Sequence, residues 1–205
     1  MTTIHPNVIE QAYTYEAYCQ LIADLLVKKE TTGDDNSEAM LHYTNMNVVR
    51  MNRLDKKVKL HEETIEFLDQ LQDDQIWLIL TEGWCADAAQ TIPVMHKMAE
   101  ASAHIELRLI LRDQHLDIMD QFLTNGGRSI PKLIVLNKDL EVLASWGPRP
   151  TDAQTLMLEA KEKISQLENE ARKAAVEQLK IDIQKWYNKD KTIQTQTEIR
   201  EKLRG

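Results

Sequence analysis

Helical periodicity dominates the first third of the chain. Apolar residues recur three or four positions apart from Val8 to about Lys29, and similar patterns run from about Glu38 to Leu54 and from about Glu62 to Leu71. The pattern predicts three helices, the first of which ends in the breaker run TTGDDNSE. Because isolated helices of this length are marginal in water, we expect them to pack on a common surface.

The pattern then changes to short, continuous apolar runs. Ile76–Leu80 follows the turn-like sequence QDDQ, and a second run extends from Ile105 to Leu111. Such runs are typical of strands that are buried on both faces. The segment between them, Ala86–Ala101, has helical spacing. The order predicts two parallel strands joined by a right-handed helical crossover.

An antiparallel pair of strands is predicted next. After a short helix at about Leu116–Leu123, the segments Lys132–Leu136 and Glu141–Trp146 both read as strands. Only a short turn around Asn137-Lys138-Asp139 joins them. A turn of this length requires the two strands to run in opposite directions.

The remainder of the chain, from Thr151 onward, predicts one long helix. Its apolar residues alternate three and four positions apart and form a narrow seam of coiled-coil type: Met157, Ala160, Ile164, Leu167, Ala171 and Ala174. Because the seam is short and rich in alanine, we favour packing on the same domain, with oligomerisation as the alternative. We expect Trp186-Tyr187 to anchor the far end of this helix.

Composition narrows the possible classes of function. The 205 residues include 25 Lys and Arg against 33 Asp and Glu, giving a formal net charge of -8. This balance argues against nucleic acid as a partner, because such binding depends on clustered cations. No basic, apolar leader opens the sequence, and no apolar stretch approaches the roughly 20 residues of a membrane span. We therefore expect a cytoplasmic protein that does not associate with membranes.

The cysteine content excludes two further kinds of site. Cys19 and Cys85 are the only cysteines, and no C-x-x-C motif or His/Cys ligand pair is present. A disulfide scaffold, a structural metal site and a bound cofactor are therefore not expected. Cys19 lies within the first predicted helix, where the expected role is that of a small buried hydrophobe. The alternative is a resolving thiol for Cys85.

Two motifs lie where the predicted strands end. Trp84-Cys85 follows the first strand, and Pro93 stands eight residues beyond the cysteine. The sequence GGRSIP, at residues 126–131, precedes the apolar strand KLIVL, and Gly147 closes the last strand. Together these features resemble those of thioredoxins, which carry a Trp-Cys pair at the start of a helix and a cis-proline beside it.

The resemblance implies an α/β, thioredoxin-like fold with a four-stranded mixed central sheet flanked by helices. The thioredoxin-like core would span residues 75–161, with a helical extension at residues 1–74 and a second one at residues 162–205, all in one integrated domain. It also implies that Ile130 and Pro131 form the backbone edge on which an extended substrate lies. The whole chain is similar to bacterial thioredoxin-like proteins whose active-site motif carries a single cysteine.

Two departures from the thioredoxin pattern limit the chemistry. Ala88 occupies the position of the resolving cysteine, and Ile79 stands where thioredoxins hold a buried acid. An internal disulfide cannot form in this motif. The leading hypothesis is monothiol exchange, in which Cys85 reacts with a protein or a low-molecular-weight thiol or disulfide in cellular redox homeostasis. The alternatives are a redox-inactive binding or scaffold protein and, with less support, a peroxidase.

The groups around Cys85 have opposite effects on the pKa of its thiol. The start of a helix favours the thiolate, whereas Asp87 in the first turn opposes it. Strand topology places Arg112, Arg128 and Arg149 at the same edge of the sheet. These guanidinium groups would lower the thiol pKa and could bind a carboxylate or phosphate of a ligand.

A structural role is equally compatible with these arginines. In that case Arg112 would pair with Asp113 and Arg149 with Asp152, and both pairs would stabilise loops. The aromatic residues beside the thiol also allow two roles. We expect Trp84 to provide an apolar platform for a substrate and Trp146 to serve in packing.

Overall fold

The computed structural model describes residues 3–204 and contains one four-stranded mixed sheet of strand order β2-β1-β3-β4. The strands are β1 (Gln75–Thr81), β2 (Ile105–Leu111), β3 (Lys132–Asn137) and β4 (Val142–Trp146). β1 pairs in parallel with β2 and antiparallel with β3, and β3 pairs antiparallel with β4. The predicted α/β, thioredoxin-like fold class is confirmed.

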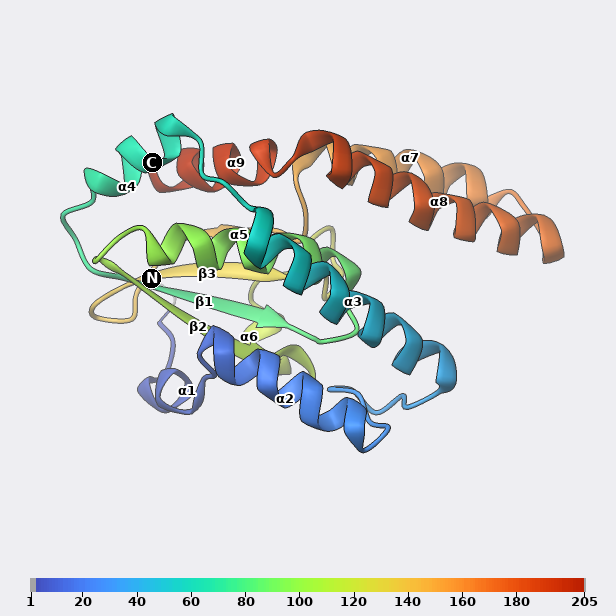
Figure 1. The fold of residues 1–205 in the computed structure, drawn as a ribbon, viewed down its shortest axis with the longest axis horizontal. Helices are drawn as coiled ribbons and strands as arrows, with labels where there is room; N and C mark the ends of the chain where they lie inside the picture. The colour runs from blue at the N-terminus through green and yellow to red at the C-terminus, as the bar shows by residue number, and fades with distance from the viewer. Residues whose placement is uncertain (1–2, 205) are drawn as a thin grey trace.

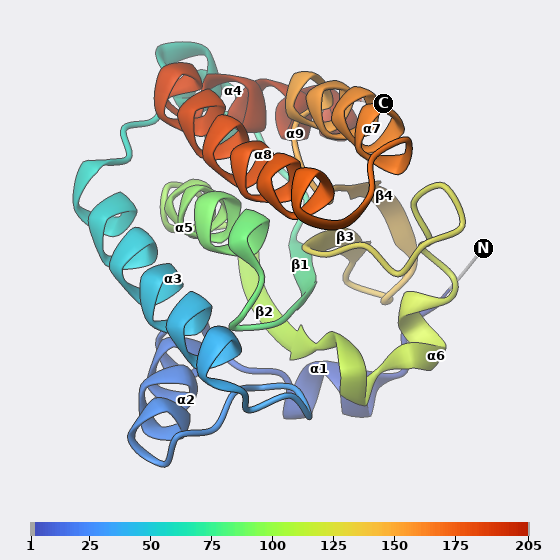
Figure 2. The ribbon, with the colours of Figure 1, turned by 90° about the vertical axis from the view of Figure 1, so that its right-hand side faces the viewer.

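Helices surround this sheet (Figures 1 and 2). α5 (Ala86–Glu100) joins β1 to β2, and α3 (Glu38–Lys57) runs beside it. The others are α1 (Pro6–Gln11), α2 (Tyr15–Val27), α4 (Glu62–Asp69), α6 (Leu116–Met119), α7 (Thr151–Ser165), α8 (Asn169–Asp190) and α9 (Ile193–Arg204), with a 3-10 turn at Arg112–Gln114.

The core lies between the sheet and its helices. β1 occupies the centre of the sheet, and Trp77–Leu80 are completely buried. From α5, Ile92, Met95 and Met98 pack into the same core. This burial explains why β1 reads as a continuous apolar run: both faces of a central strand are covered by helices.

The first predicted helix is divided in two. α1 ends at Gln11, and the extended Tyr13 exchanges two backbone hydrogen bonds with Leu109 of β2, at 2.8 and 2.9 Å. Thr14 then caps α2 by accepting a hydrogen bond from the Ala17 amide at 3.2 Å. Pairing with the edge of β2 therefore interrupts a segment whose apolar spacing alone predicts one helix.

The expected single C-terminal helix is also wrong. The chain forms three helices, because it turns at residues 166–168 and again at Lys191, whose φ of 53° ends α8. α7 and α8 make an antiparallel hairpin that projects beyond the sheet in Figure 1. The predicted seam consequently divides between the two arms of this hairpin. Of the expected anchor Trp186-Tyr187, Tyr187 is buried near the end of α8, whereas Trp186 is half-buried.

Candidate functional site

Cys85 lies at the N-terminus of α5, immediately beyond β1. It occupies the N-cap position, and its amide donates a hydrogen bond to the Glu82 carbonyl at 3.0 Å. The thiol donates to the carbonyl oxygen of Ile130 at 3.3 Å. Only 8% of the residue is exposed. The sulfur therefore lies against the loop that precedes β3, with little of it open to solvent.

The loop against Cys85 is held by strand pairing. β3 runs antiparallel to β1, so its first residue, Lys132, pairs with Leu80 near the end of β1. This register brings Ile130 and Pro131 beside the cysteine, and both are buried. The Ile130–Pro131 peptide bond is cis. The two motifs singled out in the sequence thus meet at one point.

The thiol of Cys85 is a weak acid. Burial raises its pKa to about 12, and the nearby negative charge of Asp87 adds to the effect. The amides of Ala88 and Asp87, together with Arg149, act in the opposite direction but do not compensate. The expected lowering of the thiol pKa is therefore wrong, because desolvation of the thiolate outweighs the helix terminus and the arginine.

Asp87 is the centre of a buried polar cluster. Its Oδ2 accepts hydrogen bonds from Arg149 Nη2 at 2.6 Å and Nε at 3.0 Å. Its Oδ1 accepts one from the Tyr187 hydroxyl at 2.8 Å. Arg149 also donates to Gln154 Oε1 at 2.6 Å. The predicted alternative partner of Arg149 was Asp152, whereas the structure pairs it with Asp87. Asp87 thus joins the start of α5 to the loop before α7 through Arg149 and to α8 through Tyr187.

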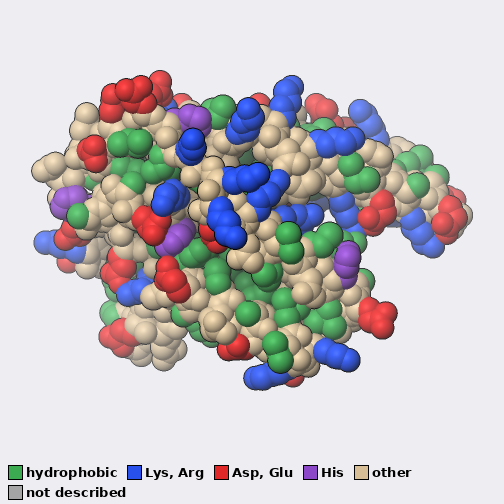
Figure 3. Space-filling view, in the orientation of Figure 1, with side chains coloured by type: hydrophobic (Ala, Val, Ile, Leu, Met, Phe, Trp, Pro, Cys, Tyr) green, Lys and Arg blue, Asp and Glu red, His purple; other side chains and the backbone are tan. Residues whose placement is uncertain are grey.

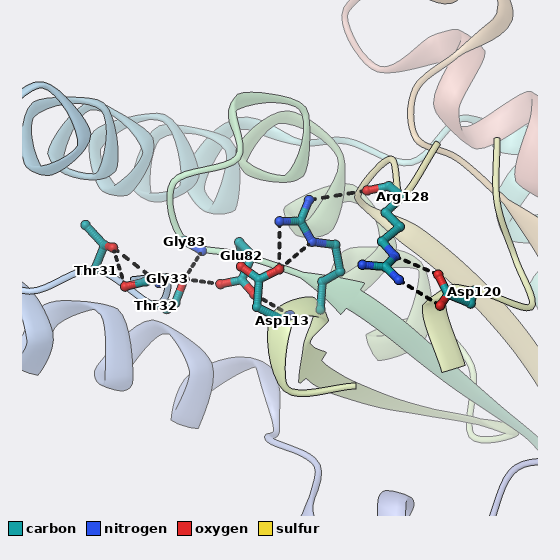
Figure 4. A network of polar contacts seen from close by, with 9 residues as sticks. Thr31, Thr32, Gly33, Glu82, Gly83, Asp113, Asp120 and Arg128 are labelled. Carbon is teal, nitrogen blue, oxygen red and sulfur yellow. Dashed lines mark hydrogen bonds and ion pairs between the residues drawn. The ribbon is translucent and has the colours of Figure 1, made fainter. Parts of the chain in front are cut away.

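The other two arginines are paired as well. Arg112 binds Asp113 through Nη2 at 2.7 Å, which confirms the predicted pair, and its guanidinium lies 5.0 Å from the ring centroid of Trp84. Arg128 binds Asp120 through two hydrogen bonds of 2.6 and 2.8 Å. Arg112 Nη1 also donates to the Arg128 carbonyl at 3.3 Å, and Figure 4 shows Arg128 with Asp120. Each of the three arginines thus has a carboxylate partner.

Glu82 is a buried carboxyl group that the sequence analysis missed. Its Oε2 accepts a hydrogen bond from Thr32 Oγ1, and its Oε1 accepts one from the Asp113 amide at 3.0 Å (Figure 4). Thr32 Oγ1 also accepts a bond from the Gly83 amide at 2.9 Å. Burial raises the pKa of Glu82. A charged residue directly after a buried strand was the available signal. Its contacts indicate that it fastens the loop before α3 to this edge of the sheet.

Trp84, which directly precedes Cys85, is half-buried. A Cβ atom at Gly33 would come within 2.9 Å of Trp84 Nε1, so the glycine permits the loop before α3 to pass close to the indole. Trp146 is buried and donates to Glu198 Oε2 of α9 at 2.8 Å. The packing role expected for Trp146 is confirmed.

A groove of about 970 Å³ opens beside Trp84 and Ala86. It lies between α3, the start of α5 and the α7–α8 hairpin. Its walls are formed largely by apolar side chains from these helices, which include Met46, Met157, Ile164, Val176, Leu179, Ile181 and Ile183.

Cys19 lies in a different environment. It is half-buried on α2 and lines a second cavity of about 600 Å³, together with Tyr15 and His96. Burial raises its thiol pKa to about 11. Both cysteines are free thiols. The partial burial agrees with the packing role expected for Cys19.

The described residues lack two further kinds of feature. Within residues 3–204, no group of three or more His, Cys, Asp or Glu side chains is arranged to hold a metal ion. No helix in the same range combines the length and apolar character that crossing a membrane requires.

Comparison with known proteins identifies a family and several solved structures with a similar fold. A family model described as Thioredoxin matches residues 33–172. A protein of unknown function from Pseudomonas aeruginosa is 16% identical, with a TM-score of 0.55 over 80% of this chain and 87% of its own. An HIV epitope-scaffold is 14% identical, with a TM-score of 0.60 over 98% of both chains. No curated protein matches the chain.

Proposed function

Because the chain belongs to the thioredoxin family, we propose that it is a monothiol thiol–disulfide exchange protein with Cys85 as its nucleophile. The observation that carries the proposal is the position of Sγ. It lies at the N-terminus of α5 and 3.3 Å from the carbonyl of Ile130, against the loop that contains Pro131. A substrate disulfide aligned along this loop would bring its sulfur to the cysteine.

The exchange has two steps. After Cys85 loses its proton to solvent, the thiolate attacks one sulfur of a disulfide. A Cys85–substrate disulfide forms, and the other sulfur leaves as a thiolate that takes up a proton. Ala88 cannot supply a second sulfur. A second, external thiolate therefore attacks the substrate sulfur and releases Cys85 in its reduced form.

The surrounding residues have distinct proposed roles in binding. The backbone of Ile130 and Pro131 would align an extended peptide or a small disulfide. Trp84 would offer an apolar surface beside it. Arg112 and Arg128 are partly exposed, so they could exchange their present carboxylate partners for one on the substrate, whereas Arg149 is committed to Asp87. The proposed partners are cytoplasmic proteins or low-molecular-weight thiols.

The burial of Cys85 supports a second candidate function. A thiol with a pKa of about 12 is almost entirely protonated at neutral pH. This favours a redox-inactive binding or scaffold protein, in which Cys85 fills the core and the helical extensions contact a partner. The two functions differ in whether the native thiol reacts.

The test uses a variant in which Cys19 is replaced by serine, so that Cys85 carries the one remaining thiol. We expect Cys19→Ser, incubated with dithiobis-nitrobenzoate at about pH 9, to release one equivalent of thionitrobenzoate and to carry one adduct by intact mass spectrometry. A glutathione addition should then remove the adduct. The matched control, Cys19→Ser with Cys85→Ser, should release none.

The opposite result identifies the scaffold. If native Cys19→Ser stays unmodified under these conditions, yet reacts fully once unfolded in urea, Cys85 is chemically intact but inaccessible. Exchange at this site would then be rejected in favour of the binding function.

A further inference from the structure

The groove between α3 and the α7–α8 hairpin has an apolar interior and a cationic rim. Its volume of about 970 Å³ lies at the upper end of the ~300–1,000 Å³ range of small-molecule sites. Two of its apolar side chains, Val176 and Ile181, remain substantially exposed at 36% and 49%. In Figure 3 the surface is hollowed on the side of the hairpin that faces α3.

The charges around this groove do not balance. Of its two acidic residues, Asp87 is bound by Arg149 and Tyr187, and Glu177 by Lys180 at 2.6 Å. Its other cationic residues include three that make no ion pair within residues 3–204, namely Arg50, Lys161 and Arg172. The groove is therefore locally positive in a chain whose formal net charge is -8.

Arg50 is the cation best placed to hold an anion. It is half-buried on α3, and its single hydrogen bond goes to Asn47 Oδ1 on the same helix, at 2.7 Å. A partly desolvated guanidinium without a carboxylate partner gains more from an anion than an exposed one does.

We propose that this groove binds a single-chain amphiphilic carboxylate of the fatty-acid class. The chain would lie along the apolar walls of α7 and α8. The carboxylate would pair with Arg50, with Lys161 and Arg172 on the opposite wall adding to the positive potential. The proposal does not depend on thiol exchange: Cys85 does not line the groove, although its neighbours Trp84 and Ala86 do.

The groove fits such a molecule better than it fits a helix of a partner protein. It is lined by helices from three parts of the chain, and the hydrogen-bonded side chains of Asp87 and Tyr187 are part of its lining. Uptake of an apolar chain would cover Val176 and Ile181, which are otherwise exposed to water.

The experiment measures binding of dansyl-labelled undecanoic acid by the increase in its fluorescence, with its methyl ester as the uncharged counterpart. We expect saturable binding of the acid, displaced by unlabelled palmitate. Arg50→Gln should raise the Kd of the acid by about tenfold, the loss of one charge-assisted contact, and leave the Kd of the ester unchanged. Arg53→Gln is the matched control, because Arg53 is exposed one turn away and does not line the groove.

A second pair of variants tests the apolar wall. Val176→Asn should weaken the acid and the ester alike, because it makes the wall polar without adding charge, whereas Val49→Asn should affect neither, because Val49 is 68% exposed and lies outside the groove. Equal Kd values for acid and ester, or equal effects of Arg50→Gln and Arg53→Gln, would refute the assignment of the carboxylate to Arg50. The absence of saturable binding by the folded protein would overturn the proposal entirely.

Discussion

At the scale of single residues, the position of Cys85 and its acidity follow from different causes. Its position comes from the strand–helix junction, which is local and readable from the sequence. Its acidity comes from burial and from the charge of Asp87, which depend on the rest of the fold. The spacing of Trp84, Cys85 and Pro131 therefore predicts where the thiol lies but not how readily it ionises.

The raised pKa gives the first residue-scale prediction. In Cys19→Ser, alkylation of Cys85 by iodoacetamide should accelerate by about tenfold per pH unit between about pH 7 and about pH 10. No plateau should appear in this interval, because the thiol pKa of about 12 keeps the thiolate a minor species throughout. Intact mass spectrometry at timed intervals measures the rate. A plateau near the ordinary thiol pKa would show that the sulfur is not desolvated.

Gly147 carries the second residue-scale prediction. Its φ is 114°, and a Cβ atom placed on it would lie 2.3 Å from the Pro131 carbonyl oxygen. Gly147→Ala should therefore lower the free energy of unfolding by about 3 kcal/mol, because backbone rather than a flexible side chain stands in the way. Urea denaturation measures the loss.

Gly126→Ala is the matched control for this prediction. Gly126 also has a positive φ, of 75°, but a Cβ atom there meets nothing within 4 Å. We expect a loss of about 1 kcal/mol from backbone strain alone. Equal losses at the two glycines would mean that the contact with Pro131 does not matter.

At the scale of elements, strands were more predictable than helix ends. The four strands follow from short apolar runs, since burial on both faces leaves a clear pattern. The break at Tyr13 was not predictable, because it depends on pairing with Leu109, far along the chain. The turn at residues 166–168 was not predictable either, because the apolar residues from Met157 to Ala174 keep helical spacing across it.

The attachment of α8 to α5 gives the element-scale prediction. Tyr187 donates its buried hydroxyl to Asp87, and α8 buries little else, with Ile183 as its other buried residue. Tyr187→Phe should lower the free energy of unfolding by about 2 kcal/mol, the value of a hydrogen bond to a charged group. Amide hydrogen exchange should accelerate in α8 and stay unchanged in β1 and β3.

The control for Tyr187→Phe is a second tyrosine with a carboxylate partner. Tyr15 donates to Asp55 Oδ1 at 2.7 Å, on α2 and α3. Tyr15→Phe should leave exchange in α8 unaltered. Faster exchange across the whole sheet in Tyr187→Phe would contradict a local role for the hydroxyl.

At the scale of the whole molecule, the last helix, α9, packs back onto the segment around the start of α4. Ile199 of α9 is completely buried, and the adjacent Arg200 donates to Glu63 Oε2 at 2.6 Å and to Thr64 Oγ1 at 3.3 Å. Gln196 donates to the Lys59 carbonyl at 3.1 Å. These contacts join segments more than a hundred positions apart, so periodicity within either segment could not reveal them.

The projecting hairpin makes the molecule easy to modify at one place. The chain leaves the core after Ala153, which is fully buried, and returns through Tyr187 and Ile199, so both bases of the hairpin are fastened. Its tip, residues 166–168, is exposed and distant from the sheet. A fluorescent label or an affinity tag inserted between Leu167 and Glu168 would therefore report on the protein without disturbing the thiol.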